Sequence, residues 1–484
     1  MSPQDFKVGQ GVTVDTRPIP LVLLTKSYRS ITLIAAVVIF LLIINLPTPE
    51  GLTFTGQKAL ATFALCLVLW ITRALPLAVT SLLALVLIPM LGILDSTEAF
   101  SLFGNQAVFF ILGAFILAAA MMKSGLSSHM ALIFLRRFGG SPGRLLAGVL
   151  LVPAFLSFLM PEHAVAAMMF PIVLEVAHGL DLKPQKTIYG QALFHSLAWG
   201  AAIGGVATYL GGARNALAVG ILKQSTGEFI GFFEWMIAVL PTVIVMLGVA
   251  YLALRRFFPS DVVSVEKAVK LIEEKNKSLG KMNTEQRLIG IIMVFTVIAW
   301  IFLGSRFELA SIAIVAVVAL FVFQLIKWKD LEEYVNWGII LMYGGAIALG
   351  FALEKSGASS WIAETTVTKW TDSPFLIVAL IALVSLLLTE GMSNAAVVAM
   401  LMPVGLGIAR QYGIDFKIMV FAISVPAGLG FAFPIASPPN AIAYSSGFIK
   451  PRKMFAIGIM MDFVALLVFL LMTQIYWPLI NLDL

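Results

Sequence analysis

Apolar segments of bilayer-spanning length follow one another along almost the whole chain. A transmembrane helix needs about 20 predominantly apolar residues, and eleven segments approach that length: 31–46, 56–73, 75–93, 106–122, 190–220, 233–254, 286–303, 307–326, 337–353, 416–447 and 453–480. Only 12% of the 484 residues are charged, whereas soluble domains carry about 25%. The sequence therefore predicts an all-α polytopic membrane protein.

Two further apolar stretches, 143–178 and 374–409, are interrupted near their centres. The first contains Pro161-Glu162-His163, and the second contains Glu390-Gly391-Met392-Ser393-Asn394. Each stretch fits either two membrane spans or a re-entrant hairpin that enters and leaves the membrane on the same side.

The distribution of lysine and arginine favours hairpins, because basic residues concentrate in cytoplasmic loops. Basic clusters flank 143–178 on both sides, at Arg136–Arg144 and at Lys183–Lys186. A hairpin places both clusters in the cytoplasm. With two hairpins there are about 11 transmembrane helices, which predicts a cytoplasmic N-terminus and an external C-terminus in a multi-pass protein of the cell (inner) membrane. Arg410 and Lys417 then lie outside, against the rule.

The same pattern divides the chain into two halves. Residues 1–30 form a cytoplasmic N-terminal segment, and the charged stretch 259–285 forms a cytoplasmic linker. The first half, 31–258, contains hairpin 143–178 and an interrupted span at 190–220. The second half, 286–484, contains hairpin 374–409 and an interrupted span at 416–447.

The two halves share an internal repeat. The triplets Lys123-Ser124-Gly125 and Lys355-Ser356-Gly357 match, and Pro171 matches Pro403 at the same spacing. Further on, residues 211–220 (GGARNALAVG) align with 436–445 (ASPPNAIAYS). The predicted topology inverts the second copy in the membrane. Inverted repeats with interrupted helices are typical of secondary transporters, whose binding sites lie near the membrane midplane.

The interruptions in the second half carry neutral oxygen ligands. Thr389, Ser393 and Asn394 supply hydroxyl and amide oxygens, and an interrupted helix exposes backbone carbonyls. Such oxygens suit a sodium ion, and the N-termini of the half-helices suit an anion. The alternative is that these polar turns only cap the half-helices.

Three motifs of the second half resemble the divalent anion/sodium symporter (solute carrier 13-type) family, which carries dicarboxylates, citrate or sulfate. They are SNA at 393–395, ASPPNAI at 436–442 and GGAIALGFALEKSG at 344–357. The resemblance implies a homodimer with a scaffold domain and a transport domain that moves like an elevator. It also implies a sodium site at Thr389, Ser393, Asn394 and Ala436, and a substrate site at Ser393, Asn394, Ala395, Ser437 and Pro438.

The first half departs from the family pattern at both elements of its sodium site. Pro161-Glu162-His163 aligns with Ser393-Asn394-Ala395, and Arg214 aligns with Pro439. An unpaired charge at the bilayer centre costs at least roughly 2.5–3.5 kcal/mol on insertion scales. We therefore expect Glu162 and Arg214 to meet, with the guanidinium in place of a sodium ion. This charge replacement comprises Glu162, His163, Gly211, Arg214 and Asn215.

A fixed arginine cannot travel with a substrate, so the first half is expected to be independent of sodium. The protein is then an anion exchanger or a symporter with fewer sodium ions. His163 either orients the hairpin tip, contacts the substrate together with Arg214, or relays protons. For Arg73, which precedes Leu75-Pro76, snorkelling is favoured over ligand binding. Asp462 lies inside the last span with no partner evident from the sequence.

Other classes of function have little support. One cysteine and four histidines without metal-binding spacing exclude a disulfide framework and argue against an enzyme, a metal centre or an organic cofactor. The formal charge of +6 resides in loops, so no nucleic-acid partner is expected. The expected partners are a small anionic substrate, the lipid bilayer, a second copy of the chain and, as the one metal, sodium. A membrane-embedded enzyme and an anion channel are the less favoured alternatives.

Overall fold

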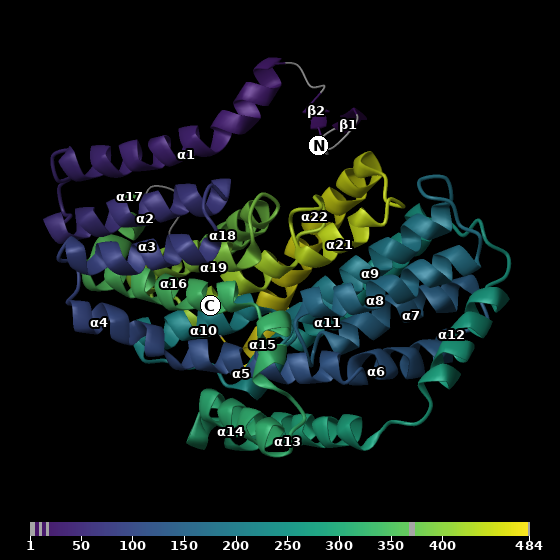
Figure 1. Cartoon of the computed structure of the whole chain (residues 1–484). Coiled ribbons are helices and arrows are strands. Elements are labelled where there is room, and N and C mark those ends of the chain that lie inside the picture. Colours follow the sequence, from purple (N-terminus) through teal and green to yellow (C-terminus); the bar gives the residue numbers. More distant parts are fainter. Residues whose placement is uncertain (1–4, 9–11, 16–18, 367–372, 483–484) are drawn as a thin grey trace.

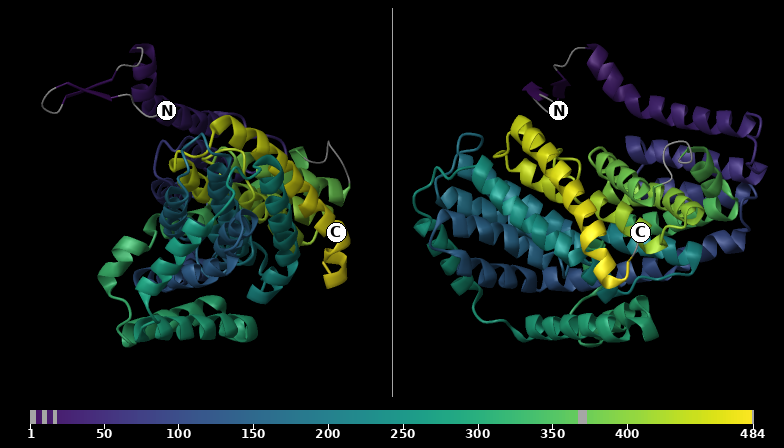
Figure 2. Two further views of the ribbon diagram at one scale, coloured as in Figure 1. Left: turned by 90° about the vertical axis from the view of Figure 1, so that its right-hand side faces the viewer. Right: turned by 180° about the vertical axis from the view of Figure 1, so that it is seen from behind.

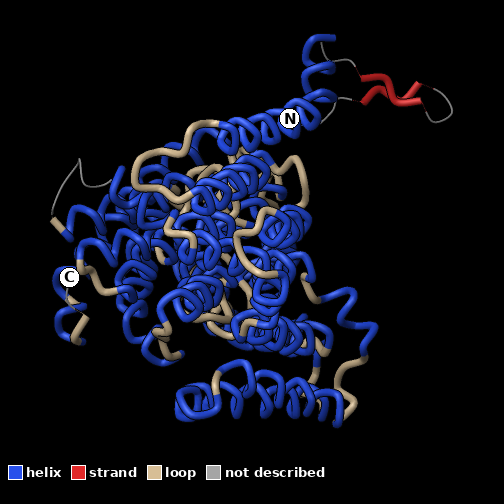
Figure 3. Tube along the Cα trace, turned by 90° about the vertical axis from the view of Figure 1, so that its left-hand side faces the viewer, coloured by secondary structure: helices blue, strands red, loops and turns tan. Residues whose placement is uncertain are grey.

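The computed structural model describes residues 5–8, 12–15, 19–366 and 373–482. Within these ranges the regular structure is helical, apart from one short antiparallel hairpin of β1 (Asp5–Val8) and β2 (Val12–Asp15). Figures 1 and 3 show this hairpin projecting from the helical body beside the start of the first helix. The fold class predicted from the sequence is confirmed.

The first half and the linker contain twelve α-helices among the described residues. They are α1 (Ile19–Asn45), α2 (Phe54–Thr72), α3 (Leu77–Met90), α4 (Ser96–Ser101), α5 (Gln106–Lys123), α6 (Leu126–Leu135), α7 (Pro142–Leu156), α8 (Glu162–Gly179), α9 (Ile188–Val206), α10 (Ala213–Thr226), α11 (Phe232–Phe257) and the linker helix α12 (Glu266–Leu279).

The second half contains ten α-helices in the described residues. They are α13 (Thr284–Phe307), α14 (Leu309–Val322), α15 (Trp328–Tyr334), α16 (Trp337–Lys355), α17 (Ala358–Thr366), α18 (Pro374–Thr389), α19 (Asn394–Tyr412), α20 (Phe416–Ser424), α21 (Pro438–Ser445) and α22 (Pro451–Ile475). Four short 3₁₀ turns complete the described helical structure: η1 (Leu102–Gly104), η2 (Arg136–Phe138), η3 (Pro426–Gly428) and η4 (Trp477–Ile480).

Eight of the described helices are long and apolar enough to cross a membrane, and five shorter apolar helices accompany them. Every span expected from the sequence contains one of these helices or, at 190–220, the pair α9 and α10. The first helix is longer than expected, because it begins at Ile19 rather than near residue 31. Pro20 lies in the first turn of α1, where a backbone N–H has no acceptor within the helix, so proline is tolerated there. No glycine or proline follows between Leu21 and Ser30, so the helix continues through this segment into the span.

The helices of each half lie in corresponding arrangements. Helices α7 and α8 form an antiparallel pair packed on α9, and α18 and α19 form a pair packed on α20. Figure 1 shows α12 beside α6 and α8 at one end of the molecule and α4 near the opposite end. Figure 2 shows α13 and α14 as a separate layer along one side.

Candidate functional site

The first hairpin is formed by α7 and α8, with its tip at 157–161. Ser141 caps α7 by accepting a hydrogen bond from the backbone N–H of Arg144 at 3.3 Å, as serine commonly does at an N-cap. Pro161 immediately precedes α8, so Glu162 and His163 are the first two residues of a helix rather than residues in the middle of a span. The break expected near Pro161 is present, and the re-entry of 143–178 into the membrane stays a prediction.

The second hairpin is formed by α18 and α19, with Ser393 as the N-cap of α19. The Ser393 hydroxyl accepts a hydrogen bond from the Ala396 N–H at 3.3 Å. The backbone N–H groups of Asn394 and Ala395 form no hydrogen bond to protein in the described part of the chain. Since the first N–H groups of a helix have no acceptor within the helix, this tip presents two free donors.

Two asparagines at corresponding positions of the repeat hold the interrupted spans in shape. The Asn215 side-chain amide donates to the carbonyls of Gly205, Val206 and Thr208, the last at 2.8 Å. The Asn440 amide donates to the carbonyls of Gly430 and Phe433, at 3.0 and 3.3 Å. Each asparagine thereby satisfies carbonyls that the interruption frees inside the apolar interior.

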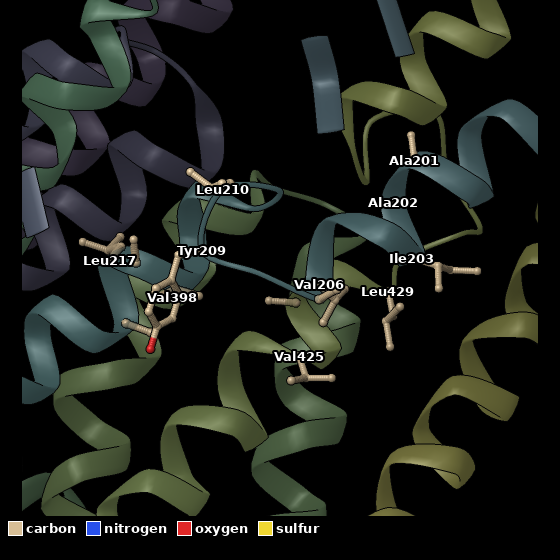
Figure 4. Packing of buried hydrophobic residues seen from close by; sticks show 14 of the residues in the cluster. Ala201, Ala202, Ile203, Val206, Tyr209, Leu210, Leu217, Val398, Val425 and Leu429 are labelled. Atoms are coloured by element: carbon tan, nitrogen blue, oxygen red, sulfur yellow. The ribbon is translucent and has the colours of Figure 1, made fainter. Parts of the chain in front are cut away.

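Apolar side chains surround the interruption between α9 and α10. Figure 4 shows Val206 just before it and Tyr209 and Leu210 within it, with Leu217 on the α10 that follows. The Tyr209 hydroxyl, itself buried, donates to the carbonyl of Ile230 at 2.7 Å. The irregular backbone is therefore enclosed by protein, which is where membrane proteins tolerate it.

Glu162 and Arg214 form a buried ion pair between the first hairpin and α10. Arg214 Nη1 lies 3.0 Å from Glu162 Oε1, and the two side chains are 2% and 6% exposed. The Glu162 backbone N–H also donates to the Gly211 carbonyl at 2.9 Å. The contact expected from the repeat alignment is therefore present.

Close backbone approach makes room for this pair. A Cβ at Gly205 would lie 2.1 Å from Glu162 Oε2, and a Cβ at Gly428 would lie 2.0 Å from Arg214 Nη2. Gly428 belongs to η3 of the second half, so the guanidinium reaches across the repeat interface. Its Nε and Nη2 atoms form no hydrogen bond to protein within the described ranges. Both atoms are enclosed by protein beside Gly428, so the guanidinium keeps its positive charge at the cavity wall with two donors unused.

Two of the oxygens expected to form the second-half sodium site, those of Thr389 and Asn394, lie together. The Thr389 hydroxyl is 2.8 Å from Asn394 Oδ1 and 2.8 Å from the Ala427 carbonyl. Ala436 is buried close by, since a Cβ at Gly430 would contact both Thr389 and Ala436. These neutral oxygens suit sodium, a hard cation that prefers oxygen ligands.

Glu390 and Asp462 stabilise the interruption after η3. Glu390 accepts hydrogen bonds from the N–H groups of Ala432 and Phe433 at 3.0 and 2.8 Å. Asp462 accepts one from the Phe431 N–H at 2.8 Å. The sequence shows no partner for Asp462, because the Phe431 amide lies 31 residues away and Glu390, whose side chain Asp462 also contacts, lies at the second hairpin.

A cavity of about 770 Å³ lies between the two hairpin tips. Its lining residues are Arg29, Arg73, Ala74, Leu75, Pro76, Leu77, Ala78, Glu162, His163, Gly211, Ala213, Arg214, Asn336, Gly338, Ile339, Met342, Ser393, Asn394, Ala395 and Pro438. Four half-helices, α8, α10, α19 and α21, each contribute residues of their first turn. Because a helix N-terminus carries partial positive charge, these four termini favour an anion in the cavity.

The lining also carries an excess of positive charge. Three arginines and one glutamate are present, so two positive charges remain after Glu162 is paired with Arg214. His163 faces the cavity as well, and its ring packs edge-on against Phe115. The cavity is therefore suited to a small molecule with about two negative charges.

The structure brings most of the predicted substrate residues to this cavity. Ser393, Asn394, Ala395, Pro438, His163 and Arg214 line it, whereas Ser437 does not. Ser437 is buried and its hydroxyl accepts from the Asn440 N–H at 3.3 Å. Asn215 likewise lies behind the wall, where it braces the interruption.

Sequence reasoning missed the part of the wall that comes from other helices. Arg73, for which snorkelling was expected, lines the cavity, as do Arg29 of α1 and Asn336 before α16. An arginine two residues before Leu75-Pro76 was the available signal, but the direction of its side chain depends on how α2 and α3 pack against the hairpins.

Comparison with known proteins identifies the family. A family profile described as the sodium:sulfate symporter transmembrane region matches residues 27–482. The chain belongs to this family. It is thus a multi-pass membrane transporter and not an enzyme, and the resemblance to divalent anion/sodium symporters is confirmed.

Individual relatives agree along nearly the whole chain. The chain is 30% identical to the sodium-dependent dicarboxylate transporter SdcS of Staphylococcus saprophyticus, over 94% of this chain and 93% of that protein. It is 31% identical to SdcS of Staphylococcus aureus, over 93% and 91%. Among solved structures, the efflux pump MtrF of Neisseria gonorrhoeae is similar with a TM-score of 0.51, 11% identity and 96% coverage of each chain. That similarity concerns the fold alone.

Proposed function

We propose that this protein is a secondary active transporter of divalent organic anions, namely C4-dicarboxylates, 2-oxoglutarate or citrate. The observation that carries the proposal is the convergence of four helix N-termini on a cavity whose lining holds two positive charges in excess. The names of the relatives, sodium-dependent dicarboxylate transporters, support the same class of substrate.

One carboxylate of the substrate binds at the second hairpin tip. The free N–H groups of Asn394 and Ala395 and the dipole of α19 stabilise it. His163 contacts the anion from the first half, and the positive charge of Arg214 in the cavity wall attracts it. The transport domain of a homodimer then carries the anion across the membrane in an elevator-type movement.

Arg214 replaces the cation of the first-half ion site. Its guanidinium is buried, salt-bridged to Glu162 and confined by Gly428, so it cannot leave with the substrate. It supplies positive charge for anion binding without coupling transport to an ion gradient. The protein accordingly works as an anion exchanger, or with reduced sodium coupling through the second-half site.

The second candidate is a sodium-coupled symporter of dicarboxylate or sulfate. The cluster of Thr389, Asn394 and Ala427 oxygens favours it, since a single sodium ion there would couple to substrate binding at the adjacent tip.

Counterflow in proteoliposomes tests the proposal. Vesicles loaded with unlabelled succinate should accumulate labelled succinate, and replacing sodium by choline should leave most of the exchange intact. Malate, citrate, 2-oxoglutarate and sulfate as competitors rank the substrates. Absence of counterflow would exclude a carrier, and a sodium dependence with a Hill coefficient near two would exclude the replacement of the first ion site.

A graft gives the converse test. Copying the second-half residues into the first half (Pro161→Ser, Glu162→Asn, His163→Ala and Arg214→Pro) removes the fixed charge and rebuilds neutral oxygens. Exchange by this variant should become strongly stimulated by sodium. A variant that remains folded but shows the sodium response of the unaltered protein would contradict the proposed role of Arg214.

A further inference from the structure

The cavity has an inner wall and an outer rim that come from different parts of the fold. Hairpin tips and half-helices form the inner wall, whereas the α2–α3 turn (73–76), Arg29 of α1 and the start of α16 form the rim. The rim elements pack on one another, α1 against α2 and α3 against α16. The rim elements thus form one packed group, which also contacts the second hairpin where α16 packs against α19.

Arg73 is the cation that the α2–α3 turn presents to the cavity. It closes α2 in a left-handed backbone conformation, with φ 52° and ψ 28°. Residues other than glycine seldom adopt this conformation, and helices that end this way usually do so with glycine. Such unfavourable backbone geometry concentrates at ligand sites.

Arg73 and Arg29 have no acidic partner in the part of the chain that the structure describes, whereas several other cations near helix ends of this chain are paired. Lys123, Lys223, Lys355, Arg410 and Lys417 each form an ion pair with a carboxylate at 2.9 Å or less. In the described residues, neither rim arginine forms an ion pair or a side-chain hydrogen bond. Glu162, the only acid among the described residues that line the cavity, is already paired with Arg214.

We propose that Arg73 binds the second charged group of the substrate and thereby makes the carrier selective for dianions over monoanions. This inference rests on the proposed function, since it assumes an anion whose first carboxylate occupies the Asn394–Ala395 tip. Arg29 adds charge at the outer edge of the same rim. The planar guanidinium of Arg73 suits a carboxylate, which it can bind with two parallel hydrogen bonds.

The inference separates two demands on the substrate. The hairpin tips recognise one anionic group, and Arg73 requires a second one at the other end of the molecule. A compound in which a neutral amide replaces the second carboxylate keeps the size and shape but loses the Arg73 contact. Succinate and its monoamide, succinamate, form such a pair.

The test compares binding of succinate and succinamate to the purified full-length protein by titration calorimetry. Unaltered protein should bind succinate roughly 10- to 100-fold more tightly, as expected for a charge-assisted hydrogen bond. Arg73→Gln should lose most of that preference while its affinity for succinamate changes little. Arg73→Lys keeps the positive charge but cannot form two parallel hydrogen bonds to a carboxylate, so it should retain part of the preference for succinate.

Arg287→Gln provides the matched control, because Arg287 is exposed near the start of α13 and does not line the cavity. It should leave both affinities unchanged. Equal succinate preference in Arg73→Gln and in unaltered protein would overturn the role of Arg73, as would equal binding of the two ligands by unaltered protein. If unaltered protein binds and exchanges none of the dianions, the proposed function itself fails. A thermal unfolding curve confirms that each variant is folded, and Arg73→Lys decides the matter if Arg73→Gln is not.

Discussion

At the scale of single residues, the buried pair of Glu162 and Arg214 is the most consequential feature. Removing one partner of a buried ion pair leaves an uncompensated charge, which costs about 3–5 kcal/mol. We expect Glu162→Gln to lower the stability of the protein by an amount in this range, measured by chemical unfolding in detergent. Asp181→Asn is the control, because the pair of Asp181 with Lys267 is 79% and 74% exposed and such pairs contribute at most about 1 kcal/mol. Similar losses in both variants would argue that Glu162 is not paired as described.

Gly428 gives a second prediction at this scale. A Cβ there would lie 2.0 Å from Arg214 Nη2, so Gly428→Ala should displace the guanidinium from the cavity wall. We expect succinate exchange to fall at least about tenfold, the loss of one hydrogen bond to a charged group, while the amount of folded protein in the membrane is retained.

The control for Gly428 is Gly248→Ala in α11. No heavy atom lies within 4 Å of a Cβ built at Gly248, and alanine is the better helix former by about 1 kcal/mol. This variant should therefore exchange succinate normally and be at least as stable. Normal exchange in Gly428→Ala would show that the position of Arg214 does not matter for transport.

At the scale of elements, α5 and α15 are joined by the pair of Lys123 and Asp330, whose Nζ and Oδ2 atoms lie 2.8 Å apart. The side-chain hydrogen bond from Lys123, together with the Lys327 backbone N–H, lowers the pKa of Asp330 below its usual value. A lowered pKa in the folded state means that the pair stabilises the protein above the unfolded pKa of about 3.9. That contribution is lost as the pH falls through the lower folded value.

The unfolding temperature of unaltered protein minus that of Asp330→Asn should therefore be positive at pH 6 and shrink toward zero as the pH falls below about 4. The pair is partly exposed, so its contribution to the free energy of unfolding should not exceed about 1 kcal/mol. The double variant Lys123→Met, Asp330→Asn should unfold like Lys123→Met alone. A difference that grows on acidification would contradict the assignment.

The elements also show what sequence can predict. Both helix breaks, between α7 and α8 and between α18 and α19, could be predicted because proline, glycine and polar residues interrupt apolar runs at matching places in the two halves. The contact of Glu162 with Arg214 followed from the repeat alignment and the cost of an unpaired charge in the membrane. Ser437 was expected to line the substrate site and does not. A motif specifies residue types, but it does not show that the Ser437 hydroxyl already accepts a hydrogen bond from the Asn440 N–H. Arg73 was missed because its position depends on the packing of the α2–α3 turn against elements far along the chain.

At the scale of the whole molecule, the predicted orientation has a direct test. Cys66, the only cysteine, is 0% exposed, so unaltered protein should not react with a membrane-impermeant maleimide. Ser278→Cys in the linker helix should react only after the cells are permeabilised. Leu479→Cys, at a residue that is 77% exposed near the C-terminus, should react in intact cells. The opposite pattern would invert the topology derived from the basic residues.

The two asparagine braces have a consequence for how such a protein can change over time. The side-chain amides of Asn215 and Asn440 fix the backbone of the interrupted spans through hydrogen bonds to carbonyls alone. These bonds do not depend on which side chains the neighbouring residues carry. The side chains that line the cavity can therefore be substituted while the path of the backbone stays the same. Under the proposed mechanism, a few substitutions at one tip and in the interrupted span that faces it would convert a carrier that uses an ion gradient into one that exchanges one metabolite for another.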